Sequence, residues 1–402
     1  MKVKYLLYIL ITVISISCHQ EYEHKTVICI PVYGQSLALG EEAIRITDFD
    51  SLANYAHGRI VTERMDHQFG FFDINESKQW VKRMINYDKR SFELTIYSMA
   101  EMLADSLGED TLICIFPGGQ GTSMISHLGK GSLPYTKFLN DIERANNAAK
   151  ERGWDFKMPA LCWMQGESDI EEYPNTNYQQ LLLQFAKDIN NDVKCITGQV
   201  DDIEIICYQT NSVSRAKNFD PLAYECHETA VPQTQMELVR DNPMFHASGP
   251  TYPYDFVREA IHIDANGQQR HGSLVATAVL DILKCRQQLR GLLVTGAECN
   301  DNEITVNFNI PCPTLTFDTI HVRKAKNYGF SVITPNNQDI AQQLFIKDDK
   351  VHIICSESAK NSRLRYAVNG ENGKSGRLNG PRGNLRDAAG NWCWQFDILL
   401  SE

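Results

Sequence analysis

The sequence predicts an α/β protein, in which a three-layer α/β/α domain with a parallel sheet precedes a smaller β-sandwich domain. The chain has 402 residues, which is more than one hydrophobic core usually organises. Short apolar runs alternate with amphipathic stretches as far as about residue 285, as in parallel strands joined by crossover helices. After about residue 291 the pattern changes to the alternation and the Gly- and Asn-rich turns of antiparallel strands.

Four apolar runs have the length of buried strands, and four segments have the periodicity of helices. We expect the strands at residues 26–30, 111–116, 160–164 and 203–208. We expect the helices at residues 96–107, 138–152, 178–189 and 273–285. Residues 41–90 are less regular and rich in aromatic side chains, so they should pass over the edge of the sheet. The predicted domain limits are residues 24–288 and 292–402.

Composition excludes some classes of function. A net charge of −11 without long runs of Lys and Arg gives nucleic acid little to bind, so we predict no nucleic-acid partner. Among the 12 cysteines, several lie inside apolar runs, where a thiol acts as a small buried side chain. Cys29, Cys114, Cys207 and Cys355 should therefore lie in the core. No CxxC pair and no His/Cys cluster with zinc spacing occurs, so we predict no metal site and no cofactor.

The first 18 residues have the pattern of an export signal. Lys2 and Lys4 precede an apolar run at residues 5–14, and small residues follow it. The end of this segment resembles the lipobox of bacterial lipoproteins, with Ser15 in place of the usual Leu or Val three residues before Cys18. We predict a signal peptide at residues 1–18 and a lipid anchor at Cys18, with plain secretion or a residual anchor helix as alternatives. The protein should reside in the periplasm or on the outer membrane or cell surface of a bacterium.

Polar residues able to carry chemistry follow three of the predicted strands. The loops read GQSLALG at residues 34–40, GGQGTS at 118–123 and WMQGESD at 163–169. A fourth motif, EAIHIDANG, covers residues 259–267. Because the carboxyl ends of parallel strands meet at one edge of the sheet, we expect these loops to lie together.

The residue types in these loops are those of serine-dependent acyl transfer. Ser36 follows a strand and a glycine, so its hydroxyl can stand on a tight turn as a nucleophile. The pattern is not the GxSxG elbow of α/β-hydrolases, which excludes that fold. His262 can act as general base, and Glu259, three residues before it, can orient the ring. The backbone N–H groups of Ser36 and Gly121 and the side-chain amide of Gln165 are candidate oxyanion donors.

The order of these blocks resembles that of the SGNH hydrolases, whose fold is flavodoxin-like. The WMQGESD block is similar to the carbohydrate esterase branch, which includes sialate O-acetylesterases and some acetylxylan esterases. The resemblance extends from about residue 26 to residue 283 and implies the same roles for Ser36, His262, Gly121 and Gln165. It implies that Glu167 supports its loop. The family usually has Asp at the acid position, so Asp255 and Asp264 remain alternatives to Glu259.

The resemblance implies an esterase that releases acetate from acetylated sugars without a cofactor, as sialate O-acetylesterases do. Acetylated xylan and lipid or aryl esters are alternative substrates. A different alternative is a glycan-binding lipoprotein without catalysis. The segments at residues 328–330, 364–367 and 383–387 resemble the β-sandwich extension behind bacterial sialate O-acetylesterase domains. That extension should act mainly as a structural cap.

Overall fold

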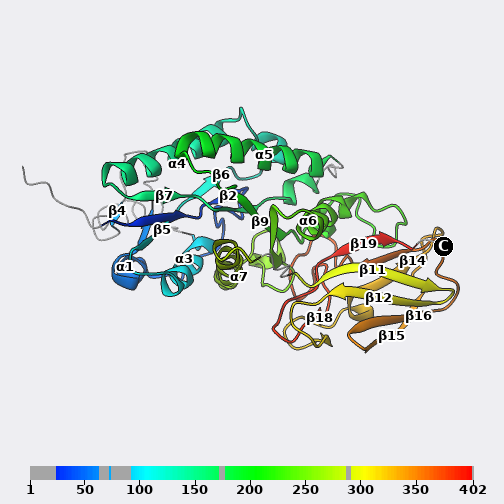
Figure 1. The fold of residues 1–402 in the computed structure, drawn as a ribbon. Coiled ribbons are helices and arrows are strands. Elements are labelled where there is room, and N and C mark those ends of the chain that lie inside the picture. The colour runs from blue at the N-terminus through cyan, green and yellow to red at the C-terminus, as the bar shows by residue number, and fades with distance from the viewer. Residues whose placement is uncertain (1–23, 63–71, 74–91, 172–176, 287–290, 401–402) are drawn as a thin grey trace, which may run out of the picture.

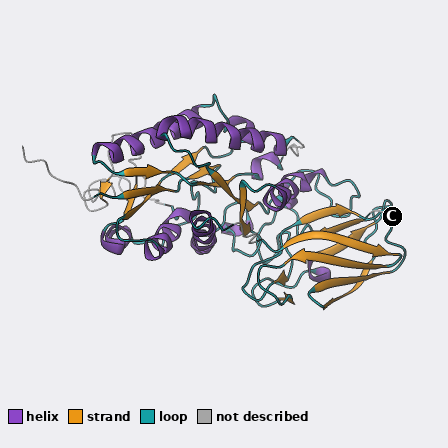
Figure 2. Ribbon diagram, viewed as in Figure 1, coloured by secondary structure: helices purple, strands orange, loops and turns teal. Residues whose placement is uncertain are grey.

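Two adjoining domains form the part of the chain that the computed structural model describes (Figure 1). The described residues are 24–62, 72–73, 92–171, 177–286 and 291–400. The first domain has helices on both faces of a mostly parallel sheet, and the second consists of antiparallel strands (Figure 2). The predicted fold class is confirmed. The predicted signal peptide and Cys18 lie outside the described residues, and the predicted domain limits remain expectations.

The sheet of the first domain contains two hydrogen-bonded groups of strands, in the orders β4-β3-β5-β1-β7 and β10-β9-β8-β2-β6. Hydrogen bonds from Ile30 N to Cys114 O and from Val32 N to Phe116 O continue from one group to the other. Within the described residues, all its pairings are parallel except that of β3 with β4. The strands are β1 (Thr26–Cys29), β2 (Val32–Gly34), β3 (Ile60–Thr62), β4 (Phe72–Asp73), β5 (Thr111–Ile115), β6 (Pro117–Gly119), β7 (Asp155–Lys157), β8 (Ala160–Met164), β9 (Glu204–Gln209) and β10 (Phe245–Pro250).

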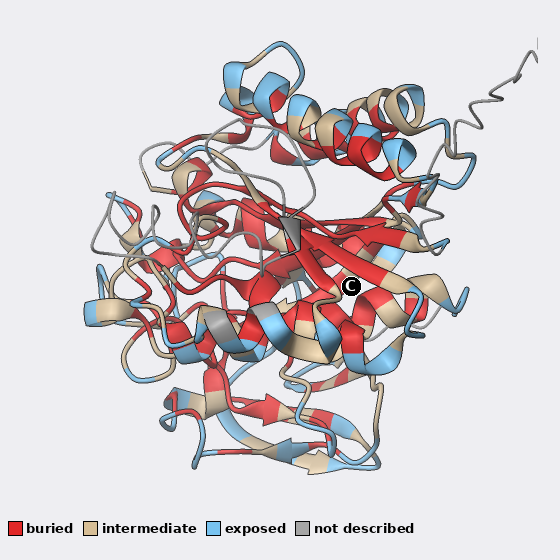
Figure 3. Ribbon diagram, turned by 90° about the vertical axis from the view of Figure 1, so that its left-hand side faces the viewer, coloured by how far each residue is buried: buried red, intermediate tan, exposed pale blue. Residues whose placement is uncertain are grey.

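The helices bury one side against the sheet and expose the other, as the burial colours in Figure 3 show. Helices α4, α5 and α6 contribute to the apolar core on one face, and α3 and α7 to the core on the other. Local sequence sets some helix starts: Ser132 caps α4 by accepting from Tyr135 N. The helices are α1 (Phe49–Asn54), α3 (Thr95–Ser106), α4 (Leu133–Glu151), α5 (Tyr178–Thr197), α6 (Ala230–Asp241) and α7 (Ala265–Leu283).

The predicted elements of the first domain match the observed ones closely. Each of the four expected strands and four expected helices corresponds to an element, namely β1, β5, β8, β9, α3, α4, α5 and α7. The region at residues 41–90 differs in part from the expectation, since its described residues include α1 and also β3, which pairs with β5 inside the sheet. A strand of three residues is too short to produce a clear apolar run.

Strand β2 lies between β6 and β8, so the strands that follow it in the chain are placed on both sides of it. β2 pairs in parallel with β6 on one side and with β8 on the other. Such a position leaves a crevice between diverging loops. The three strands approach so closely that side chains do not fit: an added Cβ would lie 2.0 Å from Met164 O at Gly34 and 1.9 Å from Gly34 O at Gly119.

The second domain contains a four-stranded sheet in the order β11-β12-β16-β15 and a three-stranded sheet in the order β14-β17-β19. Buried side chains from both sheets, such as Val306 and Phe330, belong to one core, which fits the predicted sandwich. The strands are β11 (Leu293–Asn300), β12 (Glu303–Asn309), β13 (Thr316–Phe317), β14 (Phe330–Ile333), β15 (Ala341–Lys347), β16 (Lys350–Cys355), β17 (Arg363–Tyr366), β18 (Leu385–Arg386) and β19 (Phe396–Leu399).

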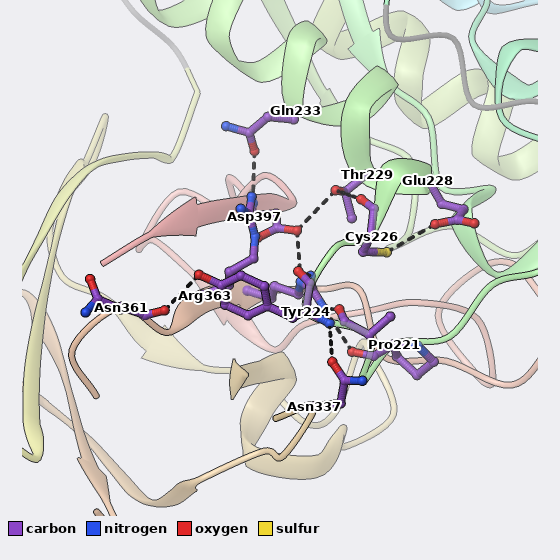
Figure 4. A network of polar contacts seen from close by, with 12 residues as sticks. Pro221, Tyr224, Cys226, Glu228, Thr229, Gln233, Asn337, Asn361, Arg363 and Asp397 are labelled. Atoms are coloured by element: carbon purple, nitrogen blue, oxygen red, sulfur yellow. Dashed lines mark hydrogen bonds and ion pairs between the residues drawn. The ribbon is translucent and has the colours of Figure 1, made fainter. Parts of the chain in front are cut away.

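Polar contacts around Asp397 join the second domain to the first, where Thr229 and Gln233 bind it (Figure 4). The side chains of Arg365 on β17 and Asp397 on β19 are 0% and 1% exposed, and their Nε and Oδ2 atoms lie 2.8 Å apart. The remaining N–H groups of Arg365 donate to backbone carbonyls of the first domain at Pro221, Ala223 and Tyr224. Both buried charges are thus paired and hydrogen-bonded, and the donors of Arg365 require a defined position of the first domain.

The described residues show where the cysteines lie and whether side chains that could bind a metal ion are grouped. Cys29, Cys114, Cys207 and Cys355 are buried as predicted, and none of the 11 described cysteines forms a disulfide. In the described part of the chain, no three His, Cys, Asp or Glu side chains are grouped so that they could hold a metal ion. None of the described helices combines the length and apolar character needed to cross a membrane.

Candidate active site

Ser36 lies in a tight turn directly after β2, with 5% of its surface exposed. The N–H groups of Leu39 and Glu41 both donate to Ser36 O, at 3.1 and 3.0 Å, and close the turn. Ser36 Oγ lies 2.8 Å from Nε2 of His262, which is 226 residues away in the sequence. A hydroxyl at this distance can pass its proton to the ring as it attacks a carbonyl carbon. The structure thus brings together the predicted nucleophile and the predicted base.

The other ring nitrogen of His262 faces a carboxylate that sequence reasoning did not select. Glu42 Oε2 lies 2.8 Å from His262 Nδ1. Gly40 and Glu42 have left-handed backbones, with φ of +66° and +64°, and they turn the chain sharply after Ser36. The hydrogen bond with His262 lowers the pKa of Glu42 below its ordinary value of 4.5. The carboxylate therefore stays charged at neutral pH and can hold the ring with Nδ1 protonated and Nε2 free to accept.

The expectation that Glu259 orients His262 does not fit the structure. Glu259 lies at the tip of a hairpin, where its backbone and that of Arg258 are left-handed, with φ of +53° and +56°. Its carboxylate is directed to the second domain: Oε1 accepts from Asn379 Nδ2 at 2.9 Å, and Oε2 lies 3.6 Å from Lys374 Nζ. The spacing of three residues suggested contact, but the turn between them carries the two side chains to different partners.

The two alternative acids also have other partners. Asp264 is the N-cap of α7, and its Oδ1 accepts from Gly267 N at 2.8 Å. Asp255 Oδ1 accepts from Arg377 Nε at 2.7 Å. Among the described carboxylates that sequence reasoning considered, none contacts the ring of His262, and Glu42 takes that position.

The backbone N–H groups of Ser36 and Gly121 make no protein hydrogen bond within the described part of the chain. Gly121 lies so near that a Cβ added to it would come within 3.8 Å of Ser36 Cβ and 3.2 Å of Glu41 Oε2. The loop of Gly121 therefore lies in van der Waals range of Ser36. Both N–H groups suit an oxyanion, as predicted.

The predicted third oxyanion donor, Gln165, is used elsewhere. Its residue is 0% exposed, and its Nε2 donates to Ser123 O at 3.1 Å and to Asp169 Oδ2 at 2.5 Å. Its Oε1 accepts from the hydroxyl of Tyr178 at 2.9 Å. An amide has two N–H donors, and both already have partners. The prediction for Gln165 therefore does not fit, since the side chain fixes the loop after β8 from below.

Gln35 is a residue of the site that sequence reasoning quoted but did not assign. Its Oε1 accepts from Gly166 N at 3.3 Å and from Ser168 N at 3.2 Å, so it ties the turn of Ser36 to the loop after β8. Its Nε2 is buried and has no hydrogen-bond partner among the residues that the structure describes. A buried donor without a partner is rare in folded proteins and can mark a position that a ligand completes. Its position directly before Ser36 in the sequence was the signal that could have identified it as a site residue.

Glu167 lies under the same loop, with 1% of its surface exposed. Tyr208 donates to it at 2.6 Å and Thr210 at 2.7 Å. Burial raises the pKa of Glu167 above its ordinary value, although these two hydrogen bonds act in the opposite direction. The contacts are those of a supporting residue, which is the part expected for Glu167.

The site can now be compared with known proteins. A model of a carbohydrate esterase family, described as sialic acid-specific acetylesterase, matches residues 34–281, which is more than half of the chain. The chain belongs to this family. The matched region of the esterase contains Ser36, Glu42, Gly121 and His262. The resemblance to the carbohydrate esterase branch of the SGNH hydrolases is thereby confirmed. The comparison with curated proteins gave no match.

The chain is similar to several solved structures. It is similar to a carbohydrate acetylesterase from Xanthomonas citri, with a TM-score of 0.65 and 14% identity, over 92% of this chain and 80% of that one. A protein from Arabidopsis thaliana is 13% identical, over 64% of this chain and 99% of its own, with a TM-score of 0.45. NanS is 14% identical, over 65% of this chain and 99% of its own, with a TM-score of 0.44. At this identity, the first likeness shows that the fold is shared.

Proposed function

We propose that this protein is a carbohydrate O-acetylesterase of the sialate O-acetylesterase type, which acts through an acetyl-enzyme on Ser36. The observation that carries the proposal is the continuous chain of contacts Ser36–His262–Glu42, with both distances at 2.8 Å, at the carboxyl edge of the sheet. Membership of the carbohydrate esterase family supports an ester hydrolase that acts on acetylated sugars.

In the proposed mechanism, Ser36 Oγ attacks the acetyl carbonyl carbon while its proton passes to His262 Nε2. The negative charge that forms on the carbonyl oxygen is held by the N–H groups of Ser36 and Gly121. His262 then protonates the sugar oxygen as it leaves, and an acetyl group remains on Ser36.

A water molecule completes the proposed cycle by giving a proton to His262 and attacking the acetyl carbon. Acetate leaves, and the proton returns to Ser36. Glu42 accepts from Nδ1 throughout and stabilises the positive charge that the ring carries in each half of the reaction. Its lowered pKa supports this part, because the carboxylate must remain ionised.

The sugar that carries the acetyl group is also part of what we propose. The family description supports acetylated sialic acid as the first substrate to test. Acetylated xylan and lipid or aryl esters remain alternatives, since the same chemistry serves all three. A glycan-binding protein without catalysis is disfavoured, because each position that acyl transfer requires is occupied by a competent residue.

We also propose that the esterase is exported and held to a bacterial membrane through a lipid on Cys18. The support is the sequence of residues 1–18 alone, with its basic start and its apolar run. Incorporation of a labelled fatty acid in wild type but not in Cys18→Ala tests the anchor.

The function is tested by acetate release from O-acetylated sialic acid and from acetylated xylan, with signal-free wild type beside Ser36→Ala. We expect release by wild type and its loss in the variant, with the better substrate identifying the sugar. A series of artificial esters of increasing acyl length distinguishes a short-chain pocket from a lipid groove. If acetate release in Ser36→Ala equals that of wild type, the assignment of the nucleophile is wrong.

A further inference from the structure

His262 is carried by a short hairpin between β10 and α7. Phe256 pairs with Ile263, Val257 N donates to His262 O at 2.8 Å, and Asp264 N donates to Asp255 O at 2.9 Å. The tip at Arg258 and Glu259 has two consecutive left-handed residues, neither of which is glycine. Such a backbone is strained for residues other than glycine and persists only where surrounding contacts hold it.

The contacts of Glu259 at the tip come from the second domain. Ser375 N donates to Glu259 O at 2.9 Å, and Asn379 Nδ2 donates to Glu259 Oε1 at 2.9 Å. Lys374 Nζ adds a longer contact of 3.6 Å to Oε2. Thus both the backbone and the carboxylate of Glu259 are bound by one segment, residues 374–379, which we call the clasp.

The clasp also holds the base of the hairpin. Arg377 N donates to Tyr254 O at 3.1 Å, and Arg377 Nε donates to Asp255 Oδ1 at 2.7 Å. Gly376, with φ of +87°, lies so close that an added Cβ would be 2.7 Å from the ring of Phe256. The clasp therefore follows the hairpin from base to tip in close contact.

On its other side the hairpin is bound by Glu42 of the first domain. One carboxylate oxygen of Glu42 pairs with His262 Nδ1 and the other with Arg258 Nη2. His262 is thus held between a carboxylate that follows the nucleophile and a segment of the second domain. The second domain can act as a fixed support because its Arg365–Asp397 ion pair is buried in the interface.

We propose that Glu259 and Asn379 are positioning residues, through which the second domain sets the distance between His262 and Ser36. This inference rests on the proposed function, because it assigns the geometry of the same catalytic pair. Displacement of a catalytic group by about 1 Å can lower a rate by about 10²-fold, so a loosened hairpin has a measurable effect on turnover. Glu259 then acts on catalysis without touching the ring.

Three variants test whether Glu259 and Asn379 position His262 or only stabilise the domain interface. Glu259→Ala removes the acceptor at the tip, whereas Glu259→Gln keeps an oxygen for Asn379 Nδ2 and serves as the rescue. Asn379→Asp retains the oxygen that accepts from Arg323 Nη1 but places a second carboxylate against Glu259. The control is Tyr224→Phe, which removes another hydrogen bond between the domains, from the Tyr224 hydroxyl to Asn361 O at 2.8 Å.

The experiment measures kcat and KM for acetate release, the pH profile of kcat/KM, the unfolding temperature, and the rate at which diisopropyl fluorophosphate labels Ser36. The last reaction needs an activated serine but no sugar. We expect Glu259→Ala and Asn379→Asp to lower kcat and the labelling rate about tenfold with little change in KM. Glu259→Gln should stay within about threefold of wild type, and Tyr224→Phe should keep the wild-type rates.

The outcomes distinguish the two proposals. If wild type is labelled but releases no acetate, the proposed function fails, and the labelling rates alone decide the positioning role. If Glu259→Ala and Asn379→Asp are labelled as fast as wild type, the positioning role is overturned while acetate release still supports the function. Equal slowing by Tyr224→Phe would also overturn it, because the effect would then belong to the interface in general. A wild type that is not labelled contradicts both.

Discussion

Glu42 Oε2 lies 2.8 Å from Nδ1 of His262, and Glu42 follows Ser36 by only six residues along the chain. The proposed nucleophile and the carboxylate that contacts His262 thus come from the same turn, whereas His262 comes from a hairpin 220 residues after Glu42. A turn that supplies both groups fixes their separation locally, and only the histidine must be brought in by the tertiary fold.

Replacement of Glu42 by Gln should lower kcat by about 10²- to 10⁴-fold, as loss of the acid does in other serine hydrolases. The amide removes the negative charge that stabilises the protonated ring and permits the wrong tautomer. The measurement is steady-state acetate release at pH 7.5, with thermal unfolding to show that the variant is folded.

Asp264→Asn is the matched control for Glu42→Gln. Asn is also a good N-cap, so α7 should keep its start and activity should stay near that of wild type. A large loss in Asp264→Asn together with an active Glu42→Gln would show that the contact of Glu42 is not the functional one.

Gln165→Met should reduce stability more than it reduces turnover per folded molecule. The change removes three buried hydrogen bonds of the amide, to Ser123 O, Asp169 Oδ2 and the Tyr178 hydroxyl, at a cost of about 2 kcal/mol. Asp169 keeps its bond from Ile125 N, and the Tyr178 hydroxyl keeps its bond to the backbone oxygen of residue 165. Chemical denaturation gives the free energy of unfolding, and titration of labelled Ser36 gives the folded fraction.

For Gly121→Ala we expect the opposite result, a larger effect on turnover than on stability. Alanine keeps the backbone N–H, and its methyl would touch Ser36 Cβ and displace only the end of the Glu41 side chain, so kcat should fall by at most about tenfold with little loss of stability. A Gln165→Met variant with wild-type stability and kcat lowered by about 10²-fold would return Gln165 to the oxyanion hole.

Arg365→Met should lower the free energy of unfolding by about 3 kcal/mol or more, because it removes a fully buried partner of Asp397 and also the donors to three backbone carbonyls of the first domain. Arg363→Met is the comparison: Arg363 is bound to the same carboxylate but is 24% exposed, and Arg365 would still neutralise the charge. We expect about 1 kcal/mol for that change. Equal losses in denaturant unfolding would contradict the central place of Arg365 in the interface.

His271 should make the fold sensitive to acid. Its ring is buried between Thr95 Oγ1 and Ser248 Oγ, and burial lowers its pKa from 6.5 to about 3. The unfolded chain therefore takes up a proton at this residue between these pH values, whereas the folded chain does not. The stability that this group contributes is complete above about pH 6.5 and is lost as the pH falls toward 3.

His271→Gln should flatten this dependence. Between pH 7.5 and pH 5, the unfolding free energy of wild type should fall more than that of the variant, by up to about 1.4 kcal/mol per pH unit below 6.5. Parallel curves for the two proteins in thermal or denaturant unfolding would show that the ring is protonated in the folded state.

Most of the fold could be predicted from the sequence, because the period of apolar residues reflects which face of each element is buried. Strands such as β8 and helices such as α3 need a continuous apolar run or stripe wherever they pack. Short elements differ: β3 has three residues and pairs with β5, so its place depends on the partner strand rather than on its own pattern.

The sequence by itself determined the family and pointed to Ser36, Gly121 and His262 as candidate site residues. Ser36 and Gly121 follow parallel strands, and position at the carboxyl edge of a sheet is a consequence of chain order. The serine, the histidine and the glycine were therefore identified from motifs, and the structure brings them together.

Only the tertiary structure decided which hydrogen-bond partner each polar side chain has. Glu42, Glu259, Asp255 and Asp264 are all acids within reach of the site in sequence terms, and left-handed turns and a neighbouring domain direct each to a different partner. Gln165 likewise had the right residue type, but its amide is occupied by groups brought there by folding. A hydrogen bond depends on side-chain direction and on competing partners, and neither is encoded in spacing along the chain.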